Sequence, residues 1–150
     1  MGKSFNSKLS GQIGESLVVS ELGRRGIIAT TLAGNVPEID ILAFRGKKSI
    51  PIQVKALKNG SLRTKANNYL HIDFDGQIQT NLGKQADINR DLIFIIVKIG
   101  DRLGNDVFYI CDQGVIQDLV LHEHSSFLKN IVALDRRNHL HLIARSICKA

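Results

Sequence analysis

Two stretches decide the fold: Val36–Phe44 (VPEIDILAF) and Ser49–Ala56 (SIPIQVKA). The segment RGKK between them has the composition of a short turn, so the pair predicts a β-hairpin. Because side chains alternate between the faces of a strand, Asp40, Gln53 and Lys55 should all point away from the aliphatic residues beside them. Burying such polar groups would be costly, so we expect an exposed site where an acid, an amide and an ammonium meet.

A helix is expected before the hairpin, over about residues 6–25, with Asn6 or Ser7 as its cap. Glu15 shares a helix face with Val18 and Leu22, so its carboxylate should lean towards the sheet. Gly11, one turn earlier on that face, should let the helix approach closely. The alternative for Glu15 is an ordinary solvated carboxylate.

Glu15, Asp40 and the Gln53-x-Lys55 motif resemble the PD-(D/E)XK nuclease superfamily, which includes restriction enzymes and archaeal Holliday-junction resolvases. The resemblance covers roughly the first 60 residues and implies an α/β fold with a restriction-endonuclease-like core. In that core a central mixed β-sheet with a βαββ active-site unit is flanked by helices, here with an added β-hairpin. Gln53 departs from the usual Asp or Glu and is similar to a minority branch, the cyanobacterial homing endonucleases of group I introns.

This resemblance implies a magnesium-dependent, site-specific DNA endonuclease that makes double-strand breaks, of the homing type. Glu15, Asp40 and the backbone carbonyl of Val54 would hold Mg²⁺, which prefers oxygen ligands. Lys55 would position the attacking water or stabilise the transition-state phosphate, and Gln53 would supply a neutral oxygen. Two alternatives stay open: a Holliday-junction resolvase, and a non-catalytic DNA-binding module with a decayed site. The simplest structural alternative is a polar sheet edge.

The charge distribution favours a nucleic-acid partner. The formal net charge is +6 and the pI is about 9.6. Seven cations and no acid occur between Arg45 and Lys65, around the expected site. The expected contacts to double-stranded DNA are Lys47, Lys48, Lys58, Arg63, Lys65, Gln77, Gln79 and Lys84.

A second hairpin is expected over about residues 68–81, because Asp75-Gly76 separates two alternating segments. Leu70, Ile72 and Phe74 should pack inward. A two-stranded ribbon fits the major groove, where the Gln77 and Gln79 amides could read adenine edges. An ordinary solvated hairpin face is the alternative.

The remainder predicts a single domain over residues 1–150, with its active-site core at about 7–58. Residues 91–99 are apolar and predict a strand covered on both faces, and 107–111 predict its neighbour. A helix should run from a cap at Asp112 to about Glu123, and a short one should start at Ser125 or Ser126. The apolar residues between 131 and 150 fit the period of a helix and that of a strand equally well.

Other signals exclude some classes. Cys111 and Cys148 are far apart, which argues against a disulfide framework or zinc knuckle. The pairs His122/His124 and His139/His141 form an alternative metal site without the expected Cys partners. No apolar run is long enough for a membrane span, and we expect a soluble, cytoplasmic protein. Because one site cannot readily cut both antiparallel strands, a homo-oligomer with at least two sites, such as a dimer, is expected. The resemblance to the homing endonucleases implies a tetramer.

Overall fold

The computed structural model describes residues 3–32, 36–57, 61–75, 78–102, 104–130 and 139–143. The chain forms two compact units, the first made of Met1–Gly60 and Leu92–Cys111, the second of Ser61–Asp91 and Asp112–Ala150. Each unit is described by itself. The expectation of a single domain stays a prediction.

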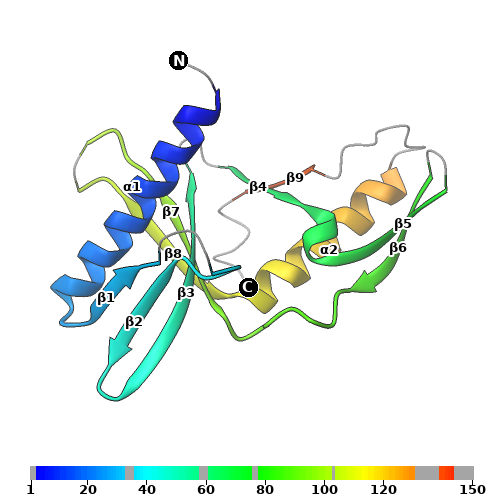
Figure 1. Ribbon diagram of the computed structural model, residues 1–150. Helices are drawn as coiled ribbons and strands as arrows, with labels where there is room; N and C mark the ends of the chain where they lie inside the picture. Colours follow the sequence, from blue (N-terminus) through cyan, green and yellow to red (C-terminus); the bar gives the residue numbers. More distant parts are fainter. Residues whose placement is uncertain are drawn as a thin grey trace. The chain divides into compact units, whose positions relative to one another are not determined.

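The first unit is built on a five-stranded mixed sheet. Its elements are α1 (Lys3–Arg24), β1 (Ile28–Thr31), β2 (Ile41–Arg45), β3 (Lys48–Leu57), β7 (Ile93–Lys98) and β8 (Val107–Asp112). The strand order is β1-β2-β3-β7-β8, with β2 antiparallel to both β1 and β3 and with β3 parallel to β7 (Figure 1). The expected α/β class with a central mixed sheet is confirmed. Along the chain, α1 is followed by the three strands β1, β2 and β3, with the β2–β3 hairpin that the sequence predicts.

The core of this unit lies between α1 and one face of the sheet. Its buried members are Val18 of α1, Ile41 and Ala43 of β2, Ile52 and Val54 of β3, and Ile95 and Val97 of β7. Four consecutive residues of β7 are buried, from Phe94 to Val97, so the prediction of a strand covered on both faces is confirmed. Packing of the Val18 face of α1 therefore determines which face of the sheet is buried.

Two expectations for α1 are wrong. The helix begins at Lys3, so Asn6 and Ser7 lie inside it and not at its N-cap. The close approach to the sheet occurs at Gly14 rather than Gly11. A Cβ at Gly14 would lie 2.8 Å from the Cβ of Ala56, whereas a Cβ at Gly11 would meet nothing within 4 Å. Gly14 has this role because the helix crosses β3 directly over Ala56.

The second unit consists of two small sheets and a helix. β4 (Ser61–Lys65) pairs with β9 (His139–Ile143), and β5 (Leu70–Asp75) pairs with β6 (Ile78–Lys84), both antiparallel. A 3-10 turn, η1 (Ala66–Asn68), links β4 to β5, and the helix is α2 (Gln113–Asn130). The predicted β5–β6 hairpin is confirmed. The break expected at Ser125 or Ser126 is wrong, because α2 is continuous.

Packing in the second unit differs from the expected pattern at the hairpin. Leu70 is buried, but Phe74 is 46% exposed instead of packed inward. A bulge between His71 and Ile72 shifts the register, and Phe74 lies near the open turn end of the hairpin. None of the helices in the described part of the chain is long and apolar enough to cross a membrane.

Candidate active site

Asp40 lies where β3 extends past the start of β2. The register pairs Ile41 with Ile52, so Val54 has no partner on β2. Instead, the Val54 amide donates to Oδ2 of Asp40 over 2.7 Å. The Asp40 backbone is itself fixed, because its amide donates to the Ile52 carbonyl and its carbonyl accepts from the Leu32 amide. The carboxylate thus occupies the place on the β3 edge that a backbone carbonyl would otherwise hold.

The Val54 carbonyl shares this edge with the Asp40 carboxylate. In an extended strand the N–H and C=O of one residue point to the same side. The Leu57 carbonyl, three residues on, accepts from Ile99 on the β7 side, so the groups of Val54 point the other way, towards Asp40. Two oxygen functions of the expected site therefore face the same edge of β3.

Glu15 is placed beside Asp40 by the close packing of α1. Gly14, the residue before it, lies against Ala56 and Val54 of β3. Burial, and secondly the negative charge of Asp40, raise the pKa of the Glu15 carboxyl. The structure thus brings together two acids that are 25 positions apart in the chain. Their mutual repulsion is the electrostatic condition that a bound cation relieves.

Gln53 and Lys55 lie on the opposite face of β3 from the core residues Ile52 and Val54, as the alternation predicts. The Lys55 side chain is exposed. Oε1 of Gln53 is buried and has no hydrogen-bond partner in the described structure. An unsatisfied buried amide oxygen is costly, so this atom has an unused capacity to accept a hydrogen bond or bind a cation.

These groups fit a hard divalent cation in type. Two carboxylates, one amide oxygen and one backbone carbonyl are oxygen ligands, the kind that Mg²⁺ and Ca²⁺ prefer. The described ranges contain no group of three or more His, Cys, Asp or Glu residues placed to hold a metal. This holds as well for the His122/His124 pair that is the alternative metal site, where His122 is exposed and His124 is buried. The candidate site thus supplies two acidic ligands, Glu15 and Asp40, and its other oxygen ligands would be neutral.

The predicted DNA contacts fall into different environments. Lys47, Lys48 and Lys65 are exposed. Lys84 is engaged in an ion pair with Asp118, with 2.7 Å between Nζ and Oδ1. Gln79 points towards α2, where its Oε1 lies 3.4 Å from Nε2 of His124, and the exposed side chains beside it on β6 are Ile78 and Thr80. Lys58, Gln77 and the side chain of Arg63 lie outside the described residues, as do Cys148 and the side chains of His139 and His141.

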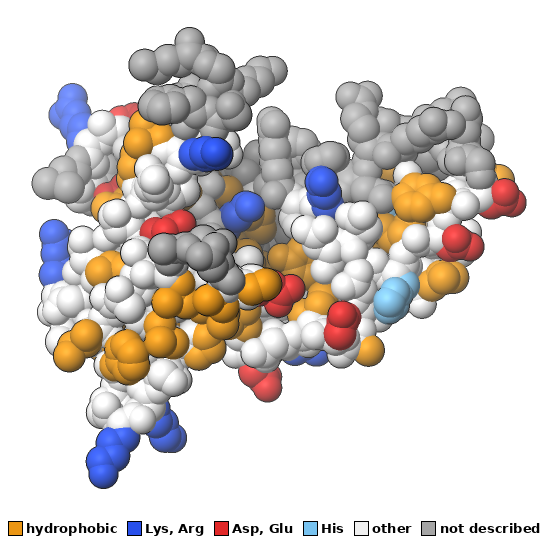
Figure 2. All heavy atoms as spheres, viewed as in Figure 1, with side chains coloured by type: hydrophobic (Ala, Val, Ile, Leu, Met, Phe, Trp, Pro, Cys, Tyr) orange, Lys and Arg blue, Asp and Glu red, His pale blue; other side chains and the backbone are white. Residues whose placement is uncertain are grey.

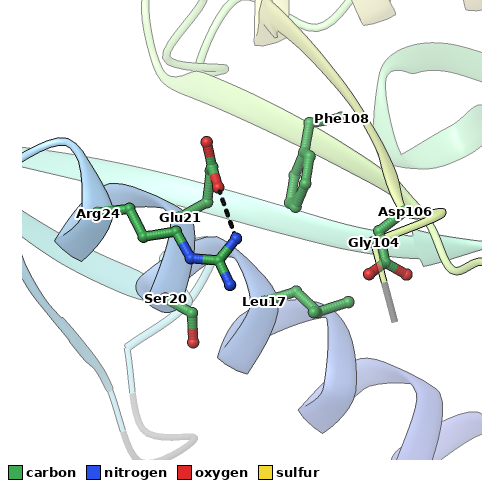
Figure 3. Close-up of a pocket in the computed structure, with 7 residues that line it drawn as sticks. All are labelled: Leu17, Ser20, Glu21, Arg24, Gly104, Asp106 and Phe108. Carbon is green, nitrogen blue, oxygen red and sulfur yellow. Dashed lines mark ion pairs between the residues drawn. The ribbon is translucent and has the colours of Figure 1, made fainter. Parts of the chain in front are cut away.

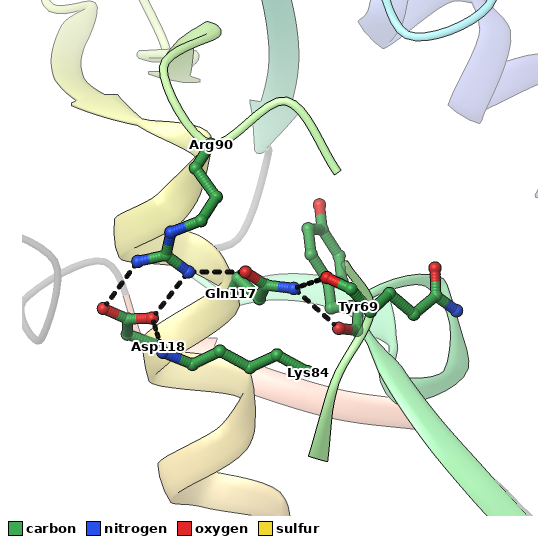
Figure 4. A network of polar contacts seen from close by, with 6 residues as sticks. Tyr69, Lys84, Arg90, Gln117 and Asp118 are labelled. Atoms are coloured by element: carbon green, nitrogen blue, oxygen red, sulfur yellow. Dashed lines mark hydrogen bonds and ion pairs between the residues drawn. The ribbon is translucent and has the colours of Figure 1, made fainter. Parts of the chain in front are cut away.

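A polar network in the second unit was not anticipated from the sequence (Figure 4). Gln117 of α2 is fully buried, and its amide nitrogen donates to the carbonyls of Tyr69 and Gln85. Arg90 donates to Oε1 of Gln117 and to both carboxylate oxygens of Asp118. These bonds lower the pKa of Asp118. The network ties the ends of β5 and β6 to α2, and the sequence gives no local signal for it beyond a Gln directly after Ile116.

A hollow of about 520 Å³ lies elsewhere on the first unit, between α1 and the segment that enters β8 (Figure 3). Its wall includes Leu17, Phe108 and the Glu21–Arg24 ion pair, in which Nη1 and Oε2 are 3.7 Å apart. Asp106, at its rim, accepts the Gly100 amide over 2.9 Å. None of the predicted site residues lines it, so this hollow is distinct from the Asp40 site.

Comparison with known proteins gives structural likeness alone. No protein-family model and no curated protein matches the sequence. Among solved structures, the bacterial homing endonuclease I-Ssp6803I is 13% identical, with 91% of this chain and 78% of that chain covered and a TM-score of 0.49. Hjc, a Holliday junction resolvase from the archaeon Archaeoglobus fulgidus, is 15% identical, with 67% and 76% covered and a TM-score of 0.38. The expected resemblance to nucleases of these two kinds is confirmed, at low identity.

Proposed function

We propose that the chain is a metal-dependent DNA endonuclease whose active site is formed by Glu15, Asp40, Gln53 and Lys55. The observation that supports this most strongly is the hydrogen bond from the Val54 amide to Asp40, 2.7 Å long, at the free edge of β3. It fixes one carboxylate beside a second acid, next to a strand that carries a buried unpaired amide oxygen and an exposed ammonium. This combination suits a phosphodiester and a divalent cation better than it suits a structural role.

Glu15, Asp40 and the Val54 carbonyl would hold the cation, which we take to be Mg²⁺. When bound, it would lower the pKa of a water molecule and stabilise negative charge on the phosphate. The hydrogen bond from Val54 engages Oδ2 of Asp40, which leaves Oδ1 to bind the cation. Lys55 carries its positive charge on the solvent side of the sheet, where it can stabilise a phosphate whose charge increases in the transition state. Gln53 offers a neutral oxygen, so the site depends more strongly on Glu15 for charge.

The partner in this proposal is double-stranded DNA. Lys47 and Lys48 extend at the turn between β2 and β3, and no acid occurs from Ile41 to Leu57. Exposed cations of this kind neutralise phosphates and release counterions. A double-strand break by one site per chain requires a symmetric oligomer, so we propose a homodimer or tetramer on DNA, which light scattering on the complex would detect.

The test is cleavage of supercoiled plasmid by the full chain with Mg²⁺ or with EDTA. Asp40→Asn is the informative variant, because an amide oxygen still accepts the Val54 hydrogen bond while the charge is lost. We expect a loss of at least about 100-fold in rate with unchanged DNA binding. Asp106→Asn is the matched control, since Asp106 also accepts a backbone amide in the same unit and lies outside the site. Its cleavage rate should equal that of the unmodified protein.

A second readout separates metal binding from catalysis. A divalent cation that binds the folded protein raises Tm by mass action. Ca²⁺ or Mg²⁺ should therefore raise the Tm of the unmodified protein and of Asp106→Asn but not that of Asp40→Asn. Equal cleavage by Asp40→Asn would refute the proposed site. Binding to DNA without metal-dependent products would identify a non-catalytic module, and a strong preference for four-way junctions over linear duplex would identify a junction resolvase.

A further inference from the structure

The sheet face opposite α1 carries more than Gln53 and Lys55. Pairing in register places Phe44 of β2 between Ile28 of β1 and Ser49 of β3. Directly opposed residues of antiparallel strands share a face, and so do alternate residues of one strand. Ser49 lies four residues before Gln53 and six before Lys55, an even number in both cases, so its side chain shares their face of β3. The side chains of Ile28, Phe44, Ser49, Gln53 and Lys55 therefore lie on one continuous face of the sheet.

Two large apolar side chains are left exposed on this face. Ile28 is 75% exposed and Phe44 is 40% exposed, although they are directly paired across β1 and β2. Their neighbours on the core side, Ala29 and Ala43, pack against the buried cluster of the first unit. The exposed pair is therefore a feature of the outer face and not a consequence of a loosely packed strand pair.

Cations lie at the tip of the hairpin, next to the Ile28–Phe44 pair. Arg45 and Lys48, paired across β2 and β3, alternate to the other face of the sheet, and Lys47 lies in the turn between them. All three are exposed, and none of them pairs with an acid in the described part of the chain. Figure 2 shows Lys and Arg side chains at the tip of the β2–β3 hairpin and hydrophobic side chains over β1 and β2 next to it. The Ile28–Phe44 pair is thus an apolar patch close to exposed positive charge. It is complementary to a nucleic acid, in which apolar base faces adjoin anionic phosphates.

The distance along the strands suggests where the pair would meet a substrate. Phe44 is four positions after Asp40 in the chain, and Ser49 is four positions before Gln53. At about 3.3 Å per residue the pair lies about 13 Å from the candidate site. This is the length of about four base-pair steps in B-DNA, which rise roughly 3.4 Å each. One DNA molecule can therefore reach both places on the same face.

We propose that Ile28 and Phe44 form an apolar wedge that contacts unstacked bases about four steps from the cleaved phosphate. The chain would thus act on duplex that is distorted at this point. Apolar side chains that enter a base step unstack it and kink the duplex, and an aromatic ring stacks on a displaced base whatever its sequence. Arg45, Lys47 and Lys48 hold the flanking phosphates. The inference rests on the proposed function only for the identity of the substrate.

The experiment measures binding of the full chain to duplexes that carry 2-aminopurine at successive positions, in Ca²⁺. We expect a rise in 2-aminopurine fluorescence at one or two adjacent positions with the unmodified protein. Phe44→Ala should abolish this rise and weaken binding about tenfold, with the salt dependence unchanged, because no phosphate contact is lost. Phe44→Leu keeps an apolar side chain and should retain part of the fluorescence rise. Thermal unfolding of each variant shows whether it is folded.

Two further variants separate the wedge from general DNA affinity. Lys47→Ala with Lys48→Ala should reduce the slope of log affinity against log salt by about two and keep the fluorescence rise. Ile110→Ala is the matched control, because Ile110 is an exposed aliphatic residue of the same unit on β8, 70% exposed, and it should change neither readout.

Unchanged affinity and fluorescence in folded Phe44→Ala would overturn the wedge. A change of oligomer mass in that variant with no effect on DNA would also overturn it and would identify the pair as a contact between copies. Failure of the proposed function is distinguishable, because loss of metal-dependent cleavage leaves the fluorescence rise intact if the wedge is real.

Discussion

The contact between α1 and β3 can be tested by two glycine substitutions in one helix. Gly14→Ala would place a Cβ 2.8 Å from that of Ala56, closer than two carbon atoms can pack, whereas Gly11→Ala would place one in open space. Each substitution gains about 0.8–1.0 kcal/mol of helix propensity. Overpacking at Gly14 costs about 1–3 kcal/mol. Gly11→Ala should therefore stabilise the protein by about 1 kcal/mol, and Gly14→Ala should range from neutral to about 2 kcal/mol destabilised.

The assay is urea unfolding of both variants, followed by the plasmid cleavage rate. Because the propensity gains cancel, the difference between the two free energies of unfolding reports overpacking alone, about 1–3 kcal/mol. Gly14→Ala should also slow cleavage by tenfold or more, since displacement of α1 by tenths of an ångström moves the adjacent Glu15 relative to Asp40. Adding Ala56→Gly removes the opposing Cβ and should restore the rate. Equal stabilisation by both alanines would refute the close approach at Gly14.

Three further predictions concern buried polar groups. Burial, and secondly Asp40, raise the pKa of Glu15, so the folded state binds its proton more tightly than the unfolded state and loses stability as pH rises through that pKa. Glu15→Gln should thus raise Tm at about pH 8 and leave it unchanged at about pH 3; an equal rise at both pH values would contradict this. Burial lowers the pKa of His124, so stability should fall as pH drops below about 6.5, and melting curves of His124→Leu should lose that dependence. Gln117→Met should lower the free energy of unfolding in urea by about 2–3 kcal/mol, because the carbonyls of Tyr69 and Gln85 lose a hydrogen-bond donor. Gln113→Met should lower it less, because the buried amide oxygen of Gln113 has no partner in the described residues.

Local sequence patterns predicted the hairpins and the apolar strand well. The turn Gly46-Lys47 between β2 and β3, with Gly46 at φ 63°, joins the two strands where the composition indicated. The alternation along β3 placed Gln53 and Lys55 away from the core, as the structure shows. Turn composition and two-residue alternation are properties of one segment, so they can be recognised without knowing which element packs against it.

Errors arose where two elements meet. Gly11 and Gly14 are both helix glycines, and the translation of α1 along β3 decides which of them contacts Ala56. Gln79 was expected to face DNA, but α2 presents His124 to it, and that helix begins 34 residues later in the chain. The continuous α2 also removed the break expected at Ser125. Each depends on a packing partner that is distant in sequence.

By itself the sequence determined the α/β class, the polar face of the central hairpin and the residue types that a nuclease site requires. The tertiary structure decided that the Asp40 carboxylate binds the Val54 amide, that Glu15 comes close enough for Asp40 to raise its pKa, and that Ile28 and Phe44 share an exposed face with Gln53 and Lys55. The physical reason is that periodicity is a property of one segment, whereas proximity between charges depends on how a helix and several strands pack against one another.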